Sequence, residues 1–356
     1  MWKRMKITGA LVVLALASPL QATGSGFSNI YVLGDSLSDQ GNLFAATWTL
    51  SGQYYPFQFA IPRPDHYFNG RFSNGPIYAD VLASEMGVSL TPSLFGGNNF
   101  AFGGTRTEYN TVENNDTKPF PFSELDQANL FPKGVYNWTL DLQRADFVAR
   151  GVDDTGGLYV VFSGSNDLVD IISIAGACAP LGCNPFEVAE AYIPGVIAGV
   201  NSVIAAFVQA GAQEILVPNM PNLGVIPGFT DPEVGPQPQT ALLAEALSWQ
   251  YNQAFDAMLA TWEGTVNIIP LNIFGLLTAV VDDPGSFGFT NATEACYTGF
   301  VAPGQDGVEC EDLGENPDKY VFWDLEHPTT ALHAVLADIM LESFVPDMLE
   351  YLSYQV

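Results

Sequence analysis

Basic residues are scarce in this chain of 356 residues. It holds 11 Lys and Arg against 39 Asp and Glu, and its formal net charge is −28. Proteins that bind nucleic acid present a positive surface to the phosphates, so the composition argues against a nucleic-acid partner. The excess of acidic residues instead favours solubility, and it disfavours contact with anionic membranes.

Cysteine is also rare, with four residues in the whole chain. None forms a Cys-x-x-Cys pair or has a histidine nearby, which argues against a zinc site. Cys178 and Cys183 bracket a short loop with Pro and Gly, and so do Cys296 and Cys310. Of the three possible connectivities, we therefore expect the disulfides Cys178–Cys183 and Cys296–Cys310.

Uninterrupted apolar runs of about 18 residues, the length that crosses a bilayer as a helix, are missing. The chain starts with a basic stretch, residues 1–6, followed by a short apolar run at 11–17 and small residues up to Ala22. This pattern is typical of a secretory signal peptide, cleaved after Ala22 or after Ala17. We expect residues 1–22 to direct export from a bacterial cell. The mature protein would then be secreted or periplasmic, without a transmembrane segment.

Linkers, repeats and low-complexity segments are absent, so residues 23–356 are expected to form one domain. Short apolar runs predict buried strands, and longer stretches between them predict helices. The strand candidates are 29–34, 98–102, 158–163, 214–218 and 266–270, and the helix candidates are 76–86, 138–150, 186–210, 239–262 and 329–348. This alternation favours an α/β fold with a parallel sheet covered by helices.

Two segments interrupt the alternation, one near 44–74 and one near 105–137. The first is rich in aromatic residues, and the second mixes acidic and aromatic residues. Each closely follows the carboxyl end of a predicted strand, the edge at which open α/β sheets bind ligands. The aromatic side chains either pack over that edge or contact a substrate, and the sequence leaves both interpretations open.

The motif Gly34-Asp35-Ser36 follows the first strand and precedes a predicted helix start at residues 37–39. A serine at the amino end of a helix lies where backbone N–H groups favour developing negative charge. Ser36 is therefore a candidate nucleophile. The alternative is that Ser36 only caps the helix.

Two further motifs follow predicted strands. Residues 98–105 end in a glycine turn, where the backbone N–H of Gly104, or of Gly103, can approach a substrate oxygen. Residues 163–167 contain Asn166, whose amide can donate a hydrogen bond to an oxyanion. The alternatives are an ordinary tight turn and a helix cap.

The last motif places Asp324 three residues before His327. The carboxylate can hold the Nδ1 proton of the imidazole, and Nε2 is then free to act as a base on a serine. Glu326 is the rival acid, but it is adjacent to His327 and is expected to point elsewhere. Of the two other histidines, His333 is interpreted as a packing residue of the following helix and His66 as a surface or rim residue.

These four motifs, in this order, resemble the GDSL family of the SGNH hydrolases. The matching residues are 34–39, the turn ending in Gly104, residues 164–167, and Asp324 with His327. The stretches 69–76 and 322–329 are similar to the secreted bacterial branch of phospholipase, lecithinase and haemolysin-like enzymes. The resemblance covers residues 29 to 345.

The resemblance implies a flavodoxin-like three-layer α/β/α sandwich with a central five-stranded parallel sheet. It implies Ser36 as nucleophile, His327 as general base and Asp324 as the residue that orients it. An oxyanion hole would come from the backbone N–H groups of Ser36 and Gly104 and from the side chain of Asn166. No metal and no organic cofactor is implied, and the acidic stretch 304–318 matches no calcium-loop spacing.

The predicted function is a secreted carboxylic ester hydrolase, of the lipase, esterase or phospholipase type, which forms an acyl-enzyme on Ser36. Its substrate would be a lipid ester or a small-molecule ester. The alternatives on the same fold are a carbohydrate acetylesterase and a lipid acyltransferase. A catalytically inactive binding protein is the remaining alternative, and the intact set of Ser36, Asn166, Asp324 and His327 argues against it.

Overall fold

The structure is a computed structural model that describes residues 26–54, 60–107, 139–231, 238–301 and 305–344. The predicted signal peptide, residues 1–22, lies outside the described residues, as does nearly all of the predicted segment 105–137. The side chains of residues 49–54, at the end of the first helix, are also not described.

A parallel sheet of four strands in the order β1-β2-β3-β4 forms the centre of the molecule. The strands are β1 (Ile30–Gly34), β2 (Leu158–Phe162), β3 (Glu214–Pro218) and β4 (Asn267–Leu271). They confirm four of the five strand predictions to within one residue, and the α/β class is confirmed with them. All five residues of β1 and all five of β2 are buried, as expected for strands covered on both faces.

The fifth predicted strand, 98–102, runs beside β1 at the edge of the sheet without forming a full strand. Phe100 donates a backbone hydrogen bond of 2.7 Å to Val32, and Phe102 donates one of 3.1 Å to Gly34. Only one parallel bridge joins this segment to β1, between Val32 and Asn99. The expected five-stranded sheet is therefore four strands plus one hydrogen-bonded edge segment.

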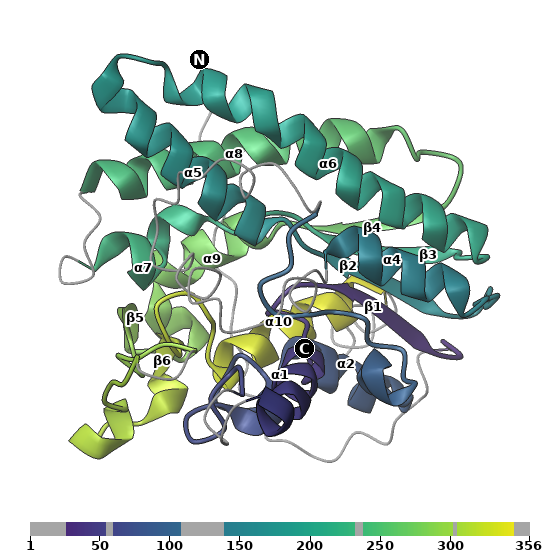
Figure 1. Ribbon diagram of the computed structural model, residues 1–356, viewed down its shortest axis with the longest axis horizontal. Coiled ribbons are helices and arrows are strands. Elements are labelled where there is room, and N and C mark those ends of the chain that lie inside the picture. The colour runs from purple at the N-terminus through teal and green to yellow at the C-terminus, as the bar shows by residue number, and fades with distance from the viewer. Residues whose placement is uncertain (1–25, 55–59, 108–138, 232–237, 302–304, 345–356) are drawn as a thin grey trace, which may run out of the picture.

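Helices cover both faces of the sheet (Figure 1). One face carries α4 (Leu140–Ala149), α5 (Ser165–Cys178), α6 (Pro185–Gln209) and α8 (Pro238–Ala260), and the other carries α2 (Tyr78–Met86) and α10 (Thr330–Phe344). Alternate side chains of β1 point to opposite faces of the sheet. Tyr31 and Leu33 pack in the core between the sheet and the helices α4, α5, α6 and α8, whereas Ile30 and Val32 pack in the core under α2 and α10. The two-residue period of a strand accounts for this division.

The short α7 (Pro227–Thr230) and α9 (Ile273–Asp282) were not predicted from the sequence, and α1 (Asn42–Tyr54) begins later than the predicted helix start at residues 37–39. The helix α5 was anticipated only as a polar turn. A second, two-stranded sheet joins β5 (Asn291–Ala295) to β6 (Tyr320–Phe322). Both expected disulfides are present, Cys178–Cys183 and Cys296–Cys310, and the second lies in an aromatic cluster beside β6.

By its length and composition alone, α6 is apolar enough to cross a membrane. In this structure, however, 44% of its most apolar 18-residue stretch is buried inside the molecule. It packs against α4, α5 and α8, and residues from Ala189 to Phe207 on one side of it belong to the main core. Burial of this kind is the ordinary reason for an apolar helix in a folded domain.

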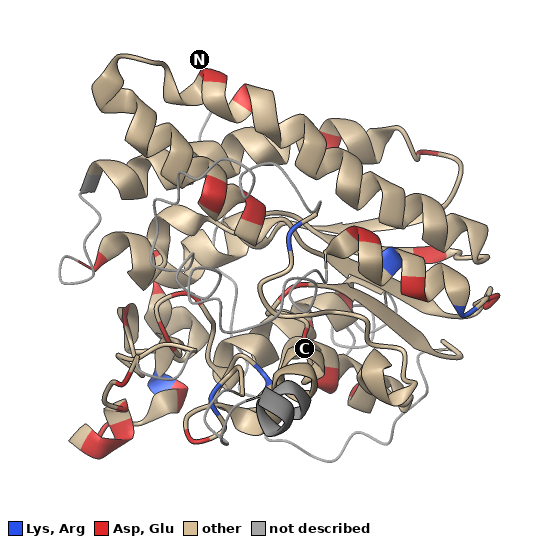
Figure 2. Ribbon diagram, viewed as in Figure 1, with Lys and Arg blue, Asp and Glu red and all other residues tan. Residues whose placement is uncertain are grey.

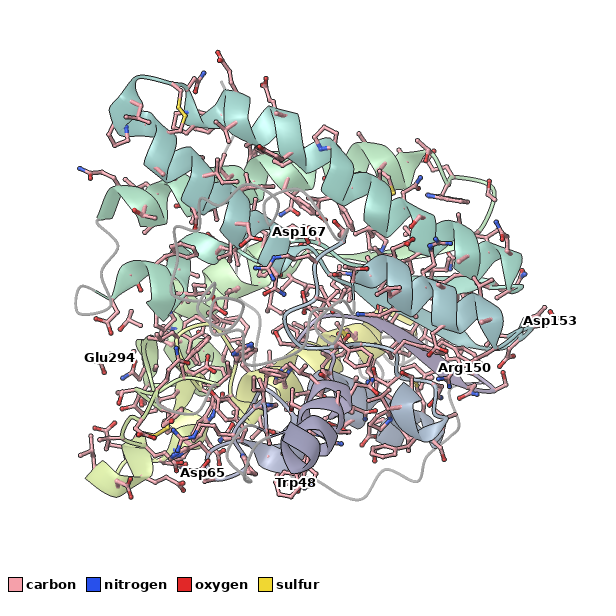
Figure 3. All side chains as sticks on the ribbon, viewed as in Figure 1. Trp48, Asp65, Arg150, Asp153, Asp167 and Glu294 are labelled. Atoms are coloured by element: carbon pink, nitrogen blue, oxygen red, sulfur yellow. A yellow bond between two sulfur atoms is a disulfide. The ribbon has the colours of Figure 1, made fainter. Side chains whose placement is uncertain are left out.

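Acidic residues are distributed over helices, strands and loops alike, with few basic ones between them (Figure 2). Figure 3 shows Asp153 and Glu294 at the periphery, whereas Asp167 lies in the interior. The Asp167 carboxylate accepts hydrogen bonds from the backbone N–H and the hydroxyl of Thr107, and burial raises its pKa to about 7. These contacts tie the segment around Thr107 to the start of α5.

Candidate active site

Ser36 lies two residues beyond the end of β1, in a tight turn. The turn is closed by Asp35, whose carboxylate accepts the N–H of Leu37 at 3.1 Å and whose carbonyl accepts the N–H of Ser38 at 3.0 Å. Burial raises the pKa of the Asp35 carboxyl to about 7. The turn holds the Ser36 side chain at the carboxyl edge of the sheet.

The predicted helix start at residues 37–39 is wrong, because α1 begins only at Asn42. Asp39 explains the difference: its buried carboxylate accepts the N–H groups of Gly41 and Asn42 and therefore caps the helix further along. Ser36 neither caps a helix nor lies at a helix amino end, so the helix dipole does not act on it as the sequence suggested.

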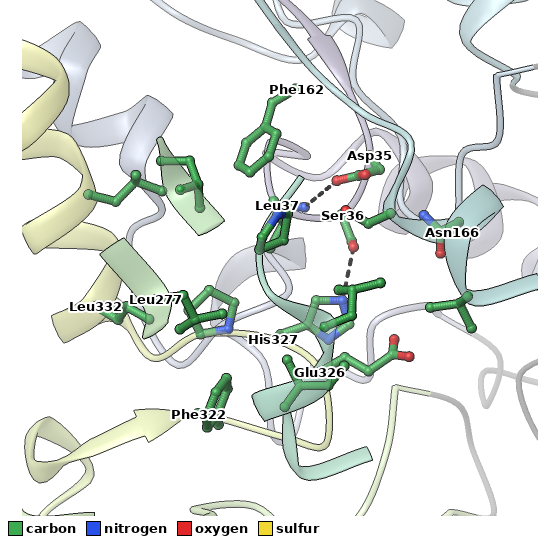
Figure 4. Close-up of a pocket in the computed structure, with 18 of the residues that line it drawn as sticks. Asp35, Ser36, Leu37, Phe162, Asn166, Leu277, Phe322, Glu326, His327 and Leu332 are labelled. Atoms are coloured by element: carbon green, nitrogen blue, oxygen red, sulfur yellow. Dashed lines mark hydrogen bonds between the residues drawn. The ribbon is translucent and has the colours of Figure 1, made fainter. Parts of the chain in front are cut away.

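His327 brings its imidazole ring to this serine from the other end of the chain. Its Nε2 lies 2.9 Å from the Oγ of Ser36 (Figure 4). Its Nδ1 lies 2.8 Å from one carboxylate oxygen of Asp324. All three residues are buried. The structure thus connects a hydroxyl, an imidazole and a carboxylate through two hydrogen bonds of ordinary length.

The loop between β6 and α10 folds so that Asp324 and His327 face each other. The Oδ1 atom of Asp324 accepts the backbone N–H groups of Glu326 and His327, at 2.8 and 2.7 Å. Trp323 closes the same loop with a 2.7 Å hydrogen bond to the carbonyl of His327. An aspartate whose side chain accepts N–H groups two and three residues later is a standard turn-former. The short spacing of the motif is therefore the cause of its geometry.

Tyr67 is a partner of this site that the sequence analysis did not identify. Its buried hydroxyl donates a 2.6 Å hydrogen bond to the Oδ2 of Asp324. It belongs to the aromatic segment 44–74, whose described part also places Phe72 against the His327 ring, with ring centroids 5.1 Å apart. The presence of many aromatics was visible in the sequence, but their contact with the Asp324 loop was not.

Charge and burial shift the pKa values of Asp324 and His327 in opposite directions. Burial by itself would raise the pKa of the Asp324 carboxyl, but His327 and the Tyr67 hydroxyl bring that pKa below its usual range. Burial would likewise lower the pKa of the His327 imidazole, but the Asp324 carboxylate outweighs it and raises that pKa. Asp324 is therefore held ionised, and it increases the proton affinity of the imidazole.

Replacing Tyr67 by Phe should lower kcat by about ten- to a hundredfold, because a buried hydrogen bond to a charged group contributes about 1.5–3 kcal/mol. KM should change little, since Tyr67 does not line the pocket beside Ser36. Steady-state kinetics on a soluble ester would measure both. The matched control is Tyr297→Phe, which removes a hydroxyl 3.4 Å from a carbonyl in the same aromatic cluster. Equal losses in both variants would contradict a specific role for Tyr67.

Gly104 lies in the turn after the 98–102 segment, whose Phe102 bonds to Gly34 at the end of β1. Its φ of +72° is in the left-handed region that favours glycine. The N–H of Gly103 donates to Asp39 at 2.8 Å, whereas among the described residues no acceptor takes the N–H of Gly104. Of the two glycines that the sequence left open, the structure thus leaves Gly104 with an available donor.

Asn166 lies in the first turn of α5 and lines the same pocket as Ser36. Its Nδ2 donates a 3.0 Å hydrogen bond to the carbonyl of Thr105. An amide nitrogen carries two hydrogens, so this bond fixes the side chain and leaves a second N–H for another acceptor. The N-terminal cap position of α5 is Gly164, and a capping role for Asn166 is therefore excluded.

The remaining candidates lie apart from this hydrogen-bonded chain. His333 is fully buried in α10 and stacks on Tyr78, and burial lowers its pKa to about 3. His66 bonds to Glu309 through Nδ1 at 2.6 Å. Glu326 lines the pocket with its carboxylate turned away from the His327 ring (Figure 4), and burial raises its pKa to about 7.

Within the described ranges, no group of three His, Cys, Asp or Glu could hold a metal ion.

A pocket opens beside Ser36 and His327, with an empty volume of about 860 Å³ including the part open to solvent. Its far wall is aliphatic and comes from α5, α9, α10 and the segment before α7. Figure 4 shows Leu277 and Leu332 on that wall. The aliphatic lining residues are Leu37, Val169, Leu223, Ile226, Ile273, Leu276, Leu277, Leu332 and Leu336.

An α/β fold that presents a serine, a histidine and a carboxylate in contact at the carboxyl edge of its sheet is typical of serine hydrolases. A family model described as GDSL-like Lipase/Acylhydrolase matches residues 30–340. The chain belongs to this family.

Individual relatives are distant in sequence. The chain is 24% identical over 324 residues to a thermolabile hemolysin of Vibrio parahaemolyticus. This alignment spans 89% of the present chain but only 63% of the hemolysin, which is the longer protein. It is 23% identical to a phosphatidylcholine-sterol acyltransferase of Aeromonas hydrophila, over 95% of this chain and 97% of the relative. Among solved structures, an extracellular lipase from Streptomyces rimosus has 16% identity and a TM-score of 0.42, over 87% of this chain and all of that one.

Proposed function

We propose that the protein is a secreted serine ester hydrolase that cleaves esters of aliphatic acids through an acyl-enzyme on Ser36. The observation that carries the proposal is the hydrogen-bonded chain of Ser36, His327 and Asp324 at the mouth of an aliphatic pocket. Export is supported by the pattern of residues 1–22 and by two disulfides, which persist in oxidising compartments.

In the first half of the reaction, the Oγ of Ser36 forms a bond to the ester carbonyl carbon while Nε2 of His327 takes the hydroxyl proton. The carbonyl electron pair moves onto oxygen and gives an oxyanion. The bond to the alcohol oxygen then breaks, and the alcohol leaves with the proton from His327. Asp324 remains ionised throughout and holds the proton on Nδ1.

In the second half, water takes the place of the alcohol. His327 removes a proton from the water as its oxygen bonds to the acyl carbon. The ester bond to Ser36 then breaks, the serine recovers its proton from His327, and the free acid leaves. No net change in the protonation of the enzyme results, and this chemistry calls for no other reactant.

Three donors would hold the oxyanion: the N–H groups of Ser36 and Gly104 and the second N–H of Asn166. The support for this is that Ser36 and Asn166 line the same pocket, that Asn166 is anchored on Thr105, and that among the described residues no acceptor takes the N–H of Gly104. Loss of one such donor costs on the order of 10²–10³ in rate in other hydrolases.

The shape of the pocket supports an acyl group longer than acetyl. Leu332 and Leu336 line it from α10, four residues apart, and Pro328 lines it from just before that helix. A helix rises 1.5 Å per residue, so the two leucines extend the wall by about 6 Å along the helix, beyond Pro328. The described aromatics next to the catalytic loop, Tyr67 and Phe72, are buried in packing, which disfavours the alternative of a carbohydrate acetylesterase with exposed sugar-stacking rings.

The test is hydrolysis of p-nitrophenyl esters from acetyl to palmitoyl. We expect kcat/KM to rise from acetyl toward longer acyl chains, because each added CH₂ group can be removed from water against the aliphatic wall. Activity confined to acetyl would contradict the aliphatic acyl site and favour carbohydrate deacetylation. No activity at any length in a folded protein would contradict the proposed function itself.

Acyl transfer is the second candidate, favoured by similarity to the acyltransferase of Aeromonas hydrophila over nearly its whole length. Hydrolysis and transfer share the acyl-enzyme and differ only in whether water or an alcohol attacks it. Adding a long-chain alcohol to the ester assay separates them, because transfer produces a new ester in place of the free acid.

A further inference from the structure

The turn between α5 and α6 exposes large apolar side chains. We call residues 177–186 the α5–α6 tip; it contains the end of α5, a 3-10 helix at Ala179–Leu181 and the first residues of α6. Leu181 is 87% exposed and Phe186 is 45% exposed. Single exposed apolar residues are common, but here two lie in one short turn.

The α5–α6 tip also lacks charge in a very acidic protein. Residues 171–186 contain no Asp, Glu, Lys or Arg, although the chain has 39 acidic residues. Figure 2 shows the turn free of red and blue, with acidic residues appearing again only along α6. The beginning of α8 lies at the same end of the molecule (Figure 1) and adds Leu242, which is 68% exposed. The result is an apolar, uncharged end.

The α5–α6 tip is held in shape before it meets any partner. The disulfide Cys178–Cys183 closes it, and Pro180 and Pro185 stand at the starts of its two helical segments. Proline and a covalent cross-link restrict the backbone, so little conformational entropy is lost when the turn docks. A turn restricted in this way holds its side chains in place before binding, so it can insert them into a partner without first having to fold on that partner.

One helix connects the α5–α6 tip to the site. Asn166 and Val169, near the start of α5, line the pocket beside Ser36, and Cys178 at the end of the same helix belongs to the tip. Twelve residues of helix separate Asn166 from Cys178, which is about 18 Å. The tip therefore stands off from the pocket and can position the enzyme without entering the substrate site.

We propose that the α5–α6 tip, together with the exposed start of α8, docks the protein on a zwitterionic lipid surface. Leu181 and Phe186 enter the boundary between headgroups and acyl chains, as the apolar face of an interfacial segment does. Insertion requires no charged side chain of the tip to lose its hydration. Because the net charge is −28, anionic lipids repel the protein, so neutral headgroups are favoured over anionic ones.

This docking goes beyond the proposed function, because it requires no catalysis. The test uses the full chain carrying Ser36→Ala, so that no lipid is hydrolysed, and co-sedimentation with phosphatidylcholine vesicles. The double change Leu181→Ser with Phe186→Ser should weaken vesicle binding at least tenfold. Replacing part of the phosphatidylcholine by phosphatidylglycerol should weaken binding of the parent at low salt.

The matched control is Phe95→Ser. Phe95 is 74% exposed and lies in a 3-10 helix, Ser93–Phe95, whose Ser93 carbonyl bonds to Arg150. Figure 3 places Arg150 at the end of the molecule away from the α5–α6 tip. This variant should bind vesicles as the parent does. The single change Leu181→Ser serves if the double variant folds poorly, as circular dichroism would reveal.

Three outcomes would overturn the proposal: no binding of the parent to phosphatidylcholine, unchanged binding of the tip variants, or an equal loss in Phe95→Ser. A dimer of the parent that becomes a monomer with the tip changes, in size-exclusion chromatography, would assign the tip to contact between copies and also overturn it. With Ser36 intact, turnover of a soluble short ester should be unchanged by the tip variants, which keeps this test separate from that of the catalytic proposal.

Discussion

Replacing Ser36 by Ala should reduce ester hydrolysis by on the order of 10⁴–10⁶. The hydroxyl is the only group on Ser36 that reaches His327, at 2.9 Å, and no acyl-enzyme can form without it. The side chain is small and the turn around it is closed by Asp35, so the fold should persist. Turnover of a p-nitrophenyl ester and the thermal unfolding temperature are the two measurements.

The control for this variant is Ser28→Ala, at the opposite end of the strand that leads to Ser36. Ser28 is exposed and bonds to Asp154, far from the pocket. Its variant should retain full turnover. Substantial turnover in Ser36→Ala would reject this serine as nucleophile, and a burst of one p-nitrophenol per enzyme in the parent would independently support the acyl-enzyme.

Replacing Asp324 by Asn should lower kcat by about 10³–10⁴, an effect of the size known for the equivalent change in other serine hydrolases. An amide in this place can present its NH₂ group to Nδ1, and the imidazole then carries its proton on Nε2, the nitrogen that faces Ser36. The base is thereby blocked although the residue is nearly isosteric. Rates measured across a pH series would separate this loss from a simple shift in the His327 pKa.

Glu326→Gln tests the rival acid next to the same histidine. Its carboxylate makes no hydrogen bond to His327 among the described contacts and points away from the ring (Figure 4). Its replacement should change kcat less than tenfold. If instead Glu326→Gln were the more damaging of the two variants, the assignment of Asp324 would have to be reversed.

The sheet could be predicted from the sequence because its strands are short apolar runs with clear ends. The prediction for β3 has the observed bounds, Glu214–Pro218. Helix α9 was missed because a single residue, Asn272, separates it from β4, and its apolar sequence reads as a continuation of that strand. The start of helix α1 was predicted too early because Asp39, whose carboxylate accepts the N–H groups of Gly41 and Asn42, was interpreted as part of the helix.

The residues of the candidate site could also be predicted, since only three histidines are present and one follows an aspartate at a turn-forming spacing. What could not be predicted depends on contacts between distant segments. Tyr67 meets Asp324 across 257 residues of sequence, and the aliphatic pocket combines side chains of four separate segments. Local patterns contain no information about such pairs.

Ser36 and His327 stand 291 residues apart in the sequence, and this separation makes activity a late property of folding. A chain emerging from the ribosome folds from its N-terminal part onward, and the Ser36 turn is made long before its base exists. Bringing the two together closes a very long loop. A partly synthesised or partly folded chain therefore contains Ser36 without the imidazole that would take its proton, and the proposed activity requires that the loop of Asp324 and His327 has docked beside β1.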